Sequence, residues 1–175
     1  MKRNLFIGIM LLALSCNAQL LADIETTSSK PAFSIGLDGT FNNDDLQLGI
    51  YPGAHWKNLE LRAAVFFMTR PYEKKVYIRQ TSSFQIRYLE WRSLLGFQVE
   101  KRMDLYNDTG FSVGAGYGYS FGTYAGSDKS AEDNWIPVFK AGIEQRFGSI
   151  FVGVGYKYID IPHVDSNLFY LSIVY

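Results

Sequence analysis

The chain has 175 residues, a length that fits one domain. Its 17 basic residues are balanced by 17 acidic ones, so there is no cationic excess of the kind that nucleic-acid binding requires. Aromatic residues make up 16% of the chain, and 16 glycines stand against 5 prolines, a composition that favours strands and tight turns over helices.

The first residues have the features of an export signal. Lys2 and Arg3 precede an apolar run over residues 5–14, which is too short to cross a bilayer as a helix. We therefore expect residues 1–18 to be a secretory signal peptide and residues 19–30 to be a short polar lead.

Cys16 leaves an alternative open at this signal. It ends the stretch "ALSC", which resembles the box at which bacterial lipoproteins are cut and lipidated, although Ala13 stands where that box prefers Leu. If Cys16 is removed with the signal peptide, the mature chain has no cysteine and no disulfide.

From Pro31 onwards the chain alternates apolar and polar residues with a period of two, which indicates β-strands and not helices. The stretch 70–92 has Pro71 at its start but no glycine or proline after it, so an extra hairpin within it stays open. Eight strands are predicted, near 31–41, 45–52, 58–69, 83–102, 110–122, 135–147, 149–160 and 167–175.

The connectors between these strands alternate in length. "PGAHWK", "YNDT" and "GS" are short, whereas "RPYEKKVYIRQTS" and "TYAGSDKSAEDN" are long. If the strands run up and down, the short connectors share one end and the long ones the other. This asymmetry is typical of transmembrane β-barrels, which have short turns on one side and longer external loops on the other.

The content of the less apolar face separates a membrane barrel from a soluble one. In residues 111–121 large apolar residues alternate with glycine and serine, where a solvent-facing strand would carry Lys, Glu or Thr. Small residues instead indicate a narrow interior. We therefore expect a lumen filled by paired charges, because isolated buried charges are costly. The polar residues assigned to the interior are Asp38, Gln47, Glu60, Arg62, Glu90, Arg92, Gln98, Glu100, Lys140, Glu144 and Arg146.

Aromatic residues mark the expected membrane interfaces. Trp135 and Phe147 lie at the two ends of the apolar face of one strand. Pro137 lies in that same strand and is expected at a bulge, or else to forgo one ladder hydrogen bond. Other aromatics expected in the girdles are Tyr51, Trp56, Tyr158 and Tyr175.

The last residues carry a family resemblance. The alternating Phe169, Leu171, Ile173 and Tyr175 resemble the C-terminal signature of bacterial outer-membrane β-barrels, which usually ends in Phe. The preceding "VGVGYKYID" is similar to the penultimate strand of the OmpA/OmpX-like group. The resemblance implies an all-β fold, a closed antiparallel eight-stranded transmembrane β-barrel over residues 31–175. It also implies a location in the bacterial outer membrane and recognition of the C-terminal segment by the barrel-assembly machinery.

The expected function is that of a monomeric integral outer-membrane protein with a plugged polar lumen. Its role would be structural or interactive, in envelope integrity or in adhesion through external loops, with outer-membrane lipids and lipopolysaccharide as partners. In the loop "RPYEKKVYIRQ", Arg70, Lys74, Lys75 and Arg79 would contact phosphates.

We expect no catalytic, cofactor-binding or metal-binding residues. The glycines of "GAGYGYSFG" alternate within a strand, whereas a dinucleotide site needs them on a turn before a helix. His55 and His163 are expected at opposite ends of the barrel and have no ligand cluster around them.

Two alternatives remain. One is a hydrolase that modifies lipid A with His163 and Ser166, since "HVDSN" is similar to the His-x-Ser-Asn motif of the outer-membrane lipid A deacylases. The extra residue breaks the period-two spacing, and no glutamate follows Ser166. The other alternative is a soluble secreted β-barrel that binds a small apolar ligand.

Overall fold

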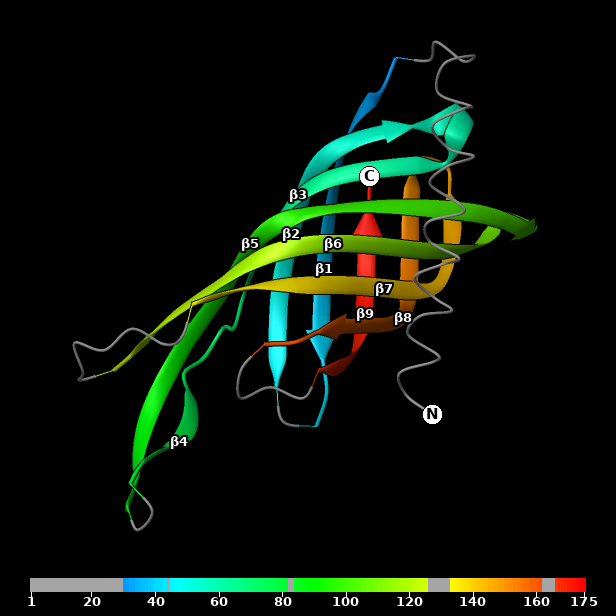
Figure 1. Cartoon of the computed structure of the whole chain (residues 1–175). Coiled ribbons are helices and arrows are strands. Elements are labelled where there is room, and N and C mark those ends of the chain that lie inside the picture. The colour runs from blue at the N-terminus through cyan, green and yellow to red at the C-terminus, as the bar shows by residue number, and fades with distance from the viewer. Residues whose placement is uncertain (1–29, 44, 82–83, 126–132, 162–165) are drawn as a thin grey trace, which may run out of the picture. The chain divides into compact units, whose positions relative to one another are not determined.

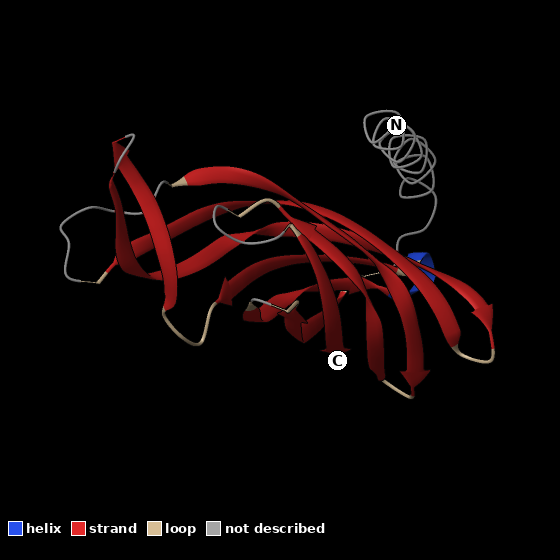
Figure 2. Cartoon of the chain, turned by 90° about the horizontal axis from the view of Figure 1, so that it is seen from below, coloured by secondary structure: helices blue, strands red, loops and turns tan. Residues whose placement is uncertain are grey.

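The computed structural model describes residues 30–43, 45–81, 84–125, 133–161 and 166–175, with backbone alone for 77–81 and 84–87. One short helical turn, η1 (Lys57–Leu59), interrupts the strands (Figure 2). No helix in the described residues is long and apolar enough to cross a membrane. The strands are β1 (Ala32–Phe41), β2 (Leu46–Trp56), β3 (Leu61–Thr69), β4 (Lys74–Thr81), β5 (Phe84–Tyr106), β6 (Thr109–Tyr124), β7 (Asn134–Phe147), β8 (Ile150–Ile159) and β9 (Asn167–Val174).

The strands form one antiparallel sheet that closes on itself (Figure 1). Its order is β3-β2-β1-β9-β8-β7-β6-β5-β4, and an additional β3–β5 ladder joins the two sides of the sheet. Because β4 lies outside this ring, eight of the nine strands make the barrel. The β1–β9 ladder extends to Ile35 and Tyr175, which exchange two backbone hydrogen bonds of 2.8 and 2.9 Å. The predicted closed eight-stranded barrel is therefore confirmed.

The extra hairpin left open by the sequence is present. The predicted loop after residue 69 contains β4, which pairs with the first part of β5 over Lys74–Glu90 to Arg79–Gln85. These two strand segments extend away from the ring at the lower left of Figure 1. Val76, Tyr88 and Tyr124 form a small separate core there. Alternating β-branched and aromatic residues in "KVYIR" favour this strand over a loop.

The predicted end of the second strand is wrong. β2 continues through "PGAHW", and the turn that follows is η1, after which Glu60 has a left-handed φ of 47°. The β2–β3 register passes from Ile50 to Gly53 without pairing Pro52, so the missing N–H falls where the ladder is interrupted. Gly53 lets β2 and β3 approach closely at this point, because a Cβ on Gly53 would lie 2.2 Å from the Ala63 carbonyl oxygen.

The connectors confirm the predicted asymmetry. At the end where β1 begins, all three connectors are short turns: residues 57–60, 107–108 and 148–149. Pro137 causes no register shift with β6 and lies one residue beyond the β7–β8 ladder, which starts at Val138. The bulge, one of the two alternatives predicted for Pro137, is therefore absent.

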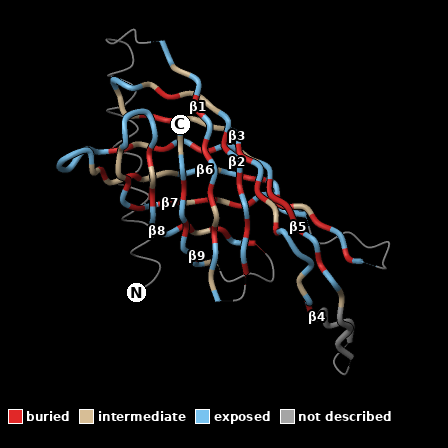
Figure 3. The backbone as a smooth tube through the Cα atoms, turned by 180° about the vertical axis from the view of Figure 1, so that it is seen from behind, coloured by how far each residue is buried: buried red, intermediate tan, exposed pale blue. Residues whose placement is uncertain are grey.

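Burial alternates along the strands, as Figure 3 shows, and the polarity is inside out. Val154 and Ile173 are 54% and 50% exposed, whereas Glu144 is fully buried and Arg92 is 3% exposed. A soluble barrel would bury the first pair and hydrate the second, so the soluble ligand-binding alternative does not fit this structure.

Candidate functional site

Charged side chains meet inside the barrel in the half that is nearer the short turns. Arg62 lies at the centre, with its Nη2 2.6 Å from Glu100 Oε1 and 2.5 Å from Glu144 Oε2. The Lys140 ammonium donates a 3.0 Å hydrogen bond to Glu100 Oε2. These four residues come from β3, β5 and β7, and each has a partner of opposite charge, as the sequence predicted.

The ring of Phe151 lies among three arginines near the short-turn end of the lumen. The guanidinium carbons of Arg62, Arg102 and Arg146 lie 5.2, 5.4 and 5.6 Å from its centroid. A ring face attracts cations, so Phe151 helps to hold three like charges in one layer. Sequence reasoning missed Phe151, because apolar residues were assigned outward; its inward position follows from its parity with Gly153 and Lys157.

A second ionic layer lies farther along the lumen. Lys157 of β8 donates 2.5 Å hydrogen bonds to Asp38 Oδ2 and to the Tyr51 hydroxyl. Tyr51 is 6% exposed, so its predicted place in the outer girdle is wrong. Gln47, Gly49 and Tyr51 alternate on the same inward face of β2. The period-two pattern of the sequence therefore already predicts that Tyr51 lies inside.

The half nearer the longer loops holds an apolar cluster together with two buried ion pairs, Glu90–Arg92 and Arg70–Asp45. This corrects the expectation that charges alone would fill the lumen. Gly118 makes room for this packing, because a Cβ there would lie 2.8 Å from Leu94 and 3.0 Å from the Phe66 ring. The cluster consists of Tyr51, Phe66, Met68, Leu94, Ile136, Val138, Ile159, Ile161 and Leu168.

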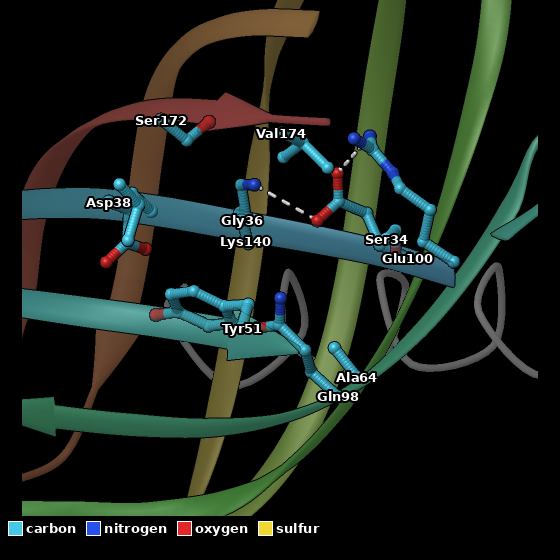
Figure 4. A pocket seen from close by; sticks show the side chains of 12 residues that line it. Ser34, Gly36, Asp38, Tyr51, Ala64, Gln98, Glu100, Lys140, Ser172 and Val174 are labelled. Atoms are coloured by element: carbon cyan, nitrogen blue, oxygen red, sulfur yellow. Dashed lines mark hydrogen bonds and ion pairs between the residues drawn. The ribbon is translucent and has the colours of Figure 1, made fainter. Parts of the chain in front are cut away.

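Between the layers lies a void of about 30 Å³, shown in Figure 4. That volume is enough for about one water molecule. Asp38 Oδ1, Arg62 Nη1 and Ser172 Oγ belong to residues that line it, and none of these atoms has a hydrogen-bond partner among the described residues. The void therefore suits a bridging water.

The end with the longer loops is held by a buried ion pair. Arg70 donates from Nε and Nη2 to the two Asp45 oxygens, each at 2.8 Å, and is 2% exposed. The Tyr72 hydroxyl donates to Asp45 Oδ1 at 3.0 Å and accepts from the Leu46 N–H. Burial and the nearby Asp45 carboxylate raise the pKa of Tyr72.

This arrangement corrects one predicted contact. Arg70 cannot meet an external phosphate, because its guanidinium is used inside the protein. Lys75 is exposed and remains a candidate for such a contact, Lys74 is half-buried, and the Arg79 side chain lies outside the described residues.

The hydrolase alternative stays a prediction. His163 lies outside the described residues, and the Ser166 hydroxyl donates a 3.2 Å hydrogen bond to Asp160 Oδ1. His55 lies at the other end of the barrel, 3.9 Å from Glu60. In the described ranges no group of three His, Cys, Asp or Glu side chains is placed to hold a metal.

Comparison with known proteins finds similar structures but no similar sequences. No known family model and no curated protein sequence matches the chain. Neisserial surface protein A (NspA) is similar in structure, with a TM-score of 0.57 and 14% identity, over 83% of this chain and 97% of that one. The N-terminal β-barrel domain of Pseudomonas aeruginosa OprF gives a TM-score of 0.58 and 11% identity, over 83% of this chain and 98% of that one.

These similarities concern the fold. The chain has the fold of the small eight-stranded outer-membrane β-barrels, which confirms the resemblance to the OmpA/OmpX-like group at this level. The outward apolar belt fits the outer membrane, where such barrels reside.

Proposed function

We propose that this protein is an integral outer-membrane barrel whose lumen is closed and whose role is structural or adhesive. The observation that carries the proposal is the filled interior: the ionic layers and the apolar cluster leave a central void of about 30 Å³. Eight-stranded barrels have an interior just wide enough for side chains, whereas porins with an aqueous channel have about 16–18 strands.

The projecting hairpin supports an interactive role. β4 and the first part of β5 extend beyond the ring on the side of the longer loops (Figure 1). Exposed Lys75 lies on this hairpin and is available to phosphate groups of lipopolysaccharide. Outer-membrane lipids and lipopolysaccharide are therefore the partners we propose.

Assembly is proposed to follow the route of similar barrels. Phe169, Leu171 and Ile173 present an exposed apolar ridge on β9, which is the segment we expect the barrel-assembly machinery to recognise. Since β9 also pairs with β1 within one chain, the barrel closes without a second copy, which supports the monomeric state that we propose.

A conductance measurement tests the closed lumen. Full-length protein reconstituted in planar bilayers is expected to give no discrete channel steps, because ion pairs and an apolar cluster fill the lumen. Insertion is verified by the altered gel migration of folded barrels before boiling. Stable, reproducible current steps from inserted protein would contradict the proposal.

A further inference from the structure

A continuous aromatic patch lies on the outer surface of β6 and β7, near the longer loops. The rings of Tyr117 and Trp135 are stacked, with centroids 5.8 Å apart and an interplanar angle of 10°. The Tyr119 ring lies 5.4 Å from Trp135 at 56°, and Phe121 continues the row 6.4 Å from Tyr119. Trp135, Tyr117 and Tyr119 are 57%, 43% and 37% exposed, so their rings are accessible from outside the barrel.

The patch lies at the rim of the lipid-facing belt. Trp135 is the second residue of β7, and the outward apolar positions of the strand, such as the 53% exposed Ile143, follow it. Aromatic side chains of transmembrane barrels gather at this level, where the hydrocarbon meets the head groups. Because the patch continues the belt, the molecule that covers it is a lipid, and the head group of that lipid lies at the rings.

The charge beside the patch is negative. Asp133 is exposed, and its Oδ2 lies 3.5 Å from the Tyr119 hydroxyl. Within the described ranges Asp133 forms no ion pair. A second exposed carboxylate, Asp160, comes directly after β8, the neighbour of β7. In sequence, residues 126–132 add two acidic residues against one lysine, so this connector does not neutralise the patch.

The cations of the projecting hairpin lie too far away to balance this charge. Lys75 pairs with Leu89 of β5, whereas Tyr119 pairs with Leu95. The distance along β5 from Leu89 to Leu95 is about 20 Å at about 3.3 Å per residue, well beyond a Debye length of about 8 Å. The arginines of β4 and of the first part of β5 lie at registers still farther from Tyr119.

An aromatic surface beside such a carboxylate favours a cation. The face of an aromatic ring carries negative potential, and proteins recognise quaternary ammonium groups with ring faces of this kind. Asp133 adds a full negative charge next to Tyr119, and the same charge repels an anionic head group. A lipid with an ammonium head group therefore fits both the rings and the carboxylate.

We propose that the patch of Tyr117, Tyr119, Trp135 and Asp133 binds the ammonium head group of a zwitterionic phospholipid from the leaflet on the longer-loop side. The ring faces contact the ammonium, the Asp133 carboxylate pairs with it, and the acyl chains lie along the apolar belt. This inference rests on the proposed function as an integral membrane barrel. A free organic cation has the same ammonium chemistry, and the test separates the two.

The test uses the fluorescence of Trp135, which is the one remaining tryptophan in the full chain carrying Trp56→Phe and Trp91→Phe. The protein is placed in phosphatidylglycerol nanodiscs with a minor fraction of one lipid brominated near its head group: phosphatidylcholine, phosphatidylglycerol or diacylglycerol. We expect phosphatidylcholine to quench Trp135 most strongly. Diacylglycerol is uncharged and has no ammonium, so it shows what the absence of repulsion alone contributes.

Substitutions at the patch are expected to weaken this preference. Asp133→Asn should raise the phosphatidylcholine fraction needed for half-quenching about fivefold, because one charge at the membrane surface is lost. Tyr119→Leu should raise it about threefold, whereas Tyr119→Phe, which keeps the ring, should leave it nearly unchanged. Asp108→Asn is the matched control and should have no effect, because Asp108 is an exposed carboxylate in a short turn at the opposite end.

Equal quenching by phosphatidylcholine and diacylglycerol, or no effect of Asp133→Asn and Tyr119→Leu, would overturn the inference while the proposed function stands. Loss of the phosphatidylcholine preference in millimolar tetramethylammonium, with a matching Trp135 signal in discs that lack phosphatidylcholine, would assign the site to a free cation and also overturn it. Failure of the folded protein to insert into nanodiscs would refute the proposed function itself.

Discussion

Replacing Lys157 by methionine is expected to lower the free energy of unfolding by about 3–5 kcal/mol, because the change leaves a buried carboxylate without its cation. Lys157 is 1% exposed and Asp38 is 7% exposed, and their 2.5 Å pair lies deep in the lumen. Urea unfolding in phospholipid vesicles, followed by tryptophan fluorescence, measures the loss.

Two further variants distinguish the loss of the Lys157–Asp38 ion pair from a general disruption of the fold. Adding Asp38→Asn to Lys157→Met should recover most of the lost stability, since no buried charge then remains unpaired. Lys75→Met, at an exposed position, should change stability by less than about 0.5 kcal/mol. A loss below about 1 kcal/mol for Lys157→Met would show that the pair is hydrated in the folded protein, against the closed lumen described here.

Val154→Arg is expected to destabilise the protein by about 2–4 kcal/mol in a bilayer, although Val154 is exposed. Val154 lies at the centre of β8 and pairs with Ile143 and Leu171, both also exposed. An arginine there would face hydrocarbon, whereas in water the same change would have little effect. Unfolding in vesicles gives the difference in free energy.

Tyr106→Arg is the matched control for this variant. Tyr106 is 77% exposed but borders the short turn between β5 and β6, near the expected membrane interface. Its replacement should change the free energy of unfolding by about 0–1 kcal/mol. Similar small effects at Val154 and Tyr106 would indicate that both face water and would contradict a lipid-facing belt.

The period-two pattern predicted most of the barrel because each strand carries its own face assignment. Outward Leu171 and Ile173 and inward Arg62 and Glu144 follow from alternation alone, without knowledge of strand partners. Tyr51 is an exception, because its aromatic type favours a membrane girdle whereas its parity with Gln47 and Gly49 predicts the lumen. The structure follows the parity, since Tyr51 is buried.

The pairings inside the lumen could not be predicted in the same way. Arg62 meets Glu144 across 82 residues of sequence, and Lys157 meets Asp38 across 119. Such contacts depend on strand register and on closure through β1 and β9, which alternation does not specify. The pair of Arg70 and Asp45 was likewise hidden, because a loop arginine has no periodic pattern to mark it as buried.

The end of β2 shows a limit of turn signals. "PGAHW" has the composition of a turn, yet Pro52 sits at a break in the ladder and Gly53 lets two strands approach closely. The same residue types mark turns in one setting and close strand contacts in another, and only the three-dimensional neighbours distinguish the two.

The most direct test of the inside-out polarity is collision accessibility of nitroxide labels. Single cysteines replace Phe97, Val154 and Ile173 in a background in which Cys16 is replaced, and the labelled proteins are placed in bilayers. We predict high accessibility to lipid-soluble oxygen and low accessibility to a water-soluble nickel chelate at all three positions. Labels that are shielded from both reagents, as in a shared apolar core, or that are open to the nickel chelate, would contradict the account.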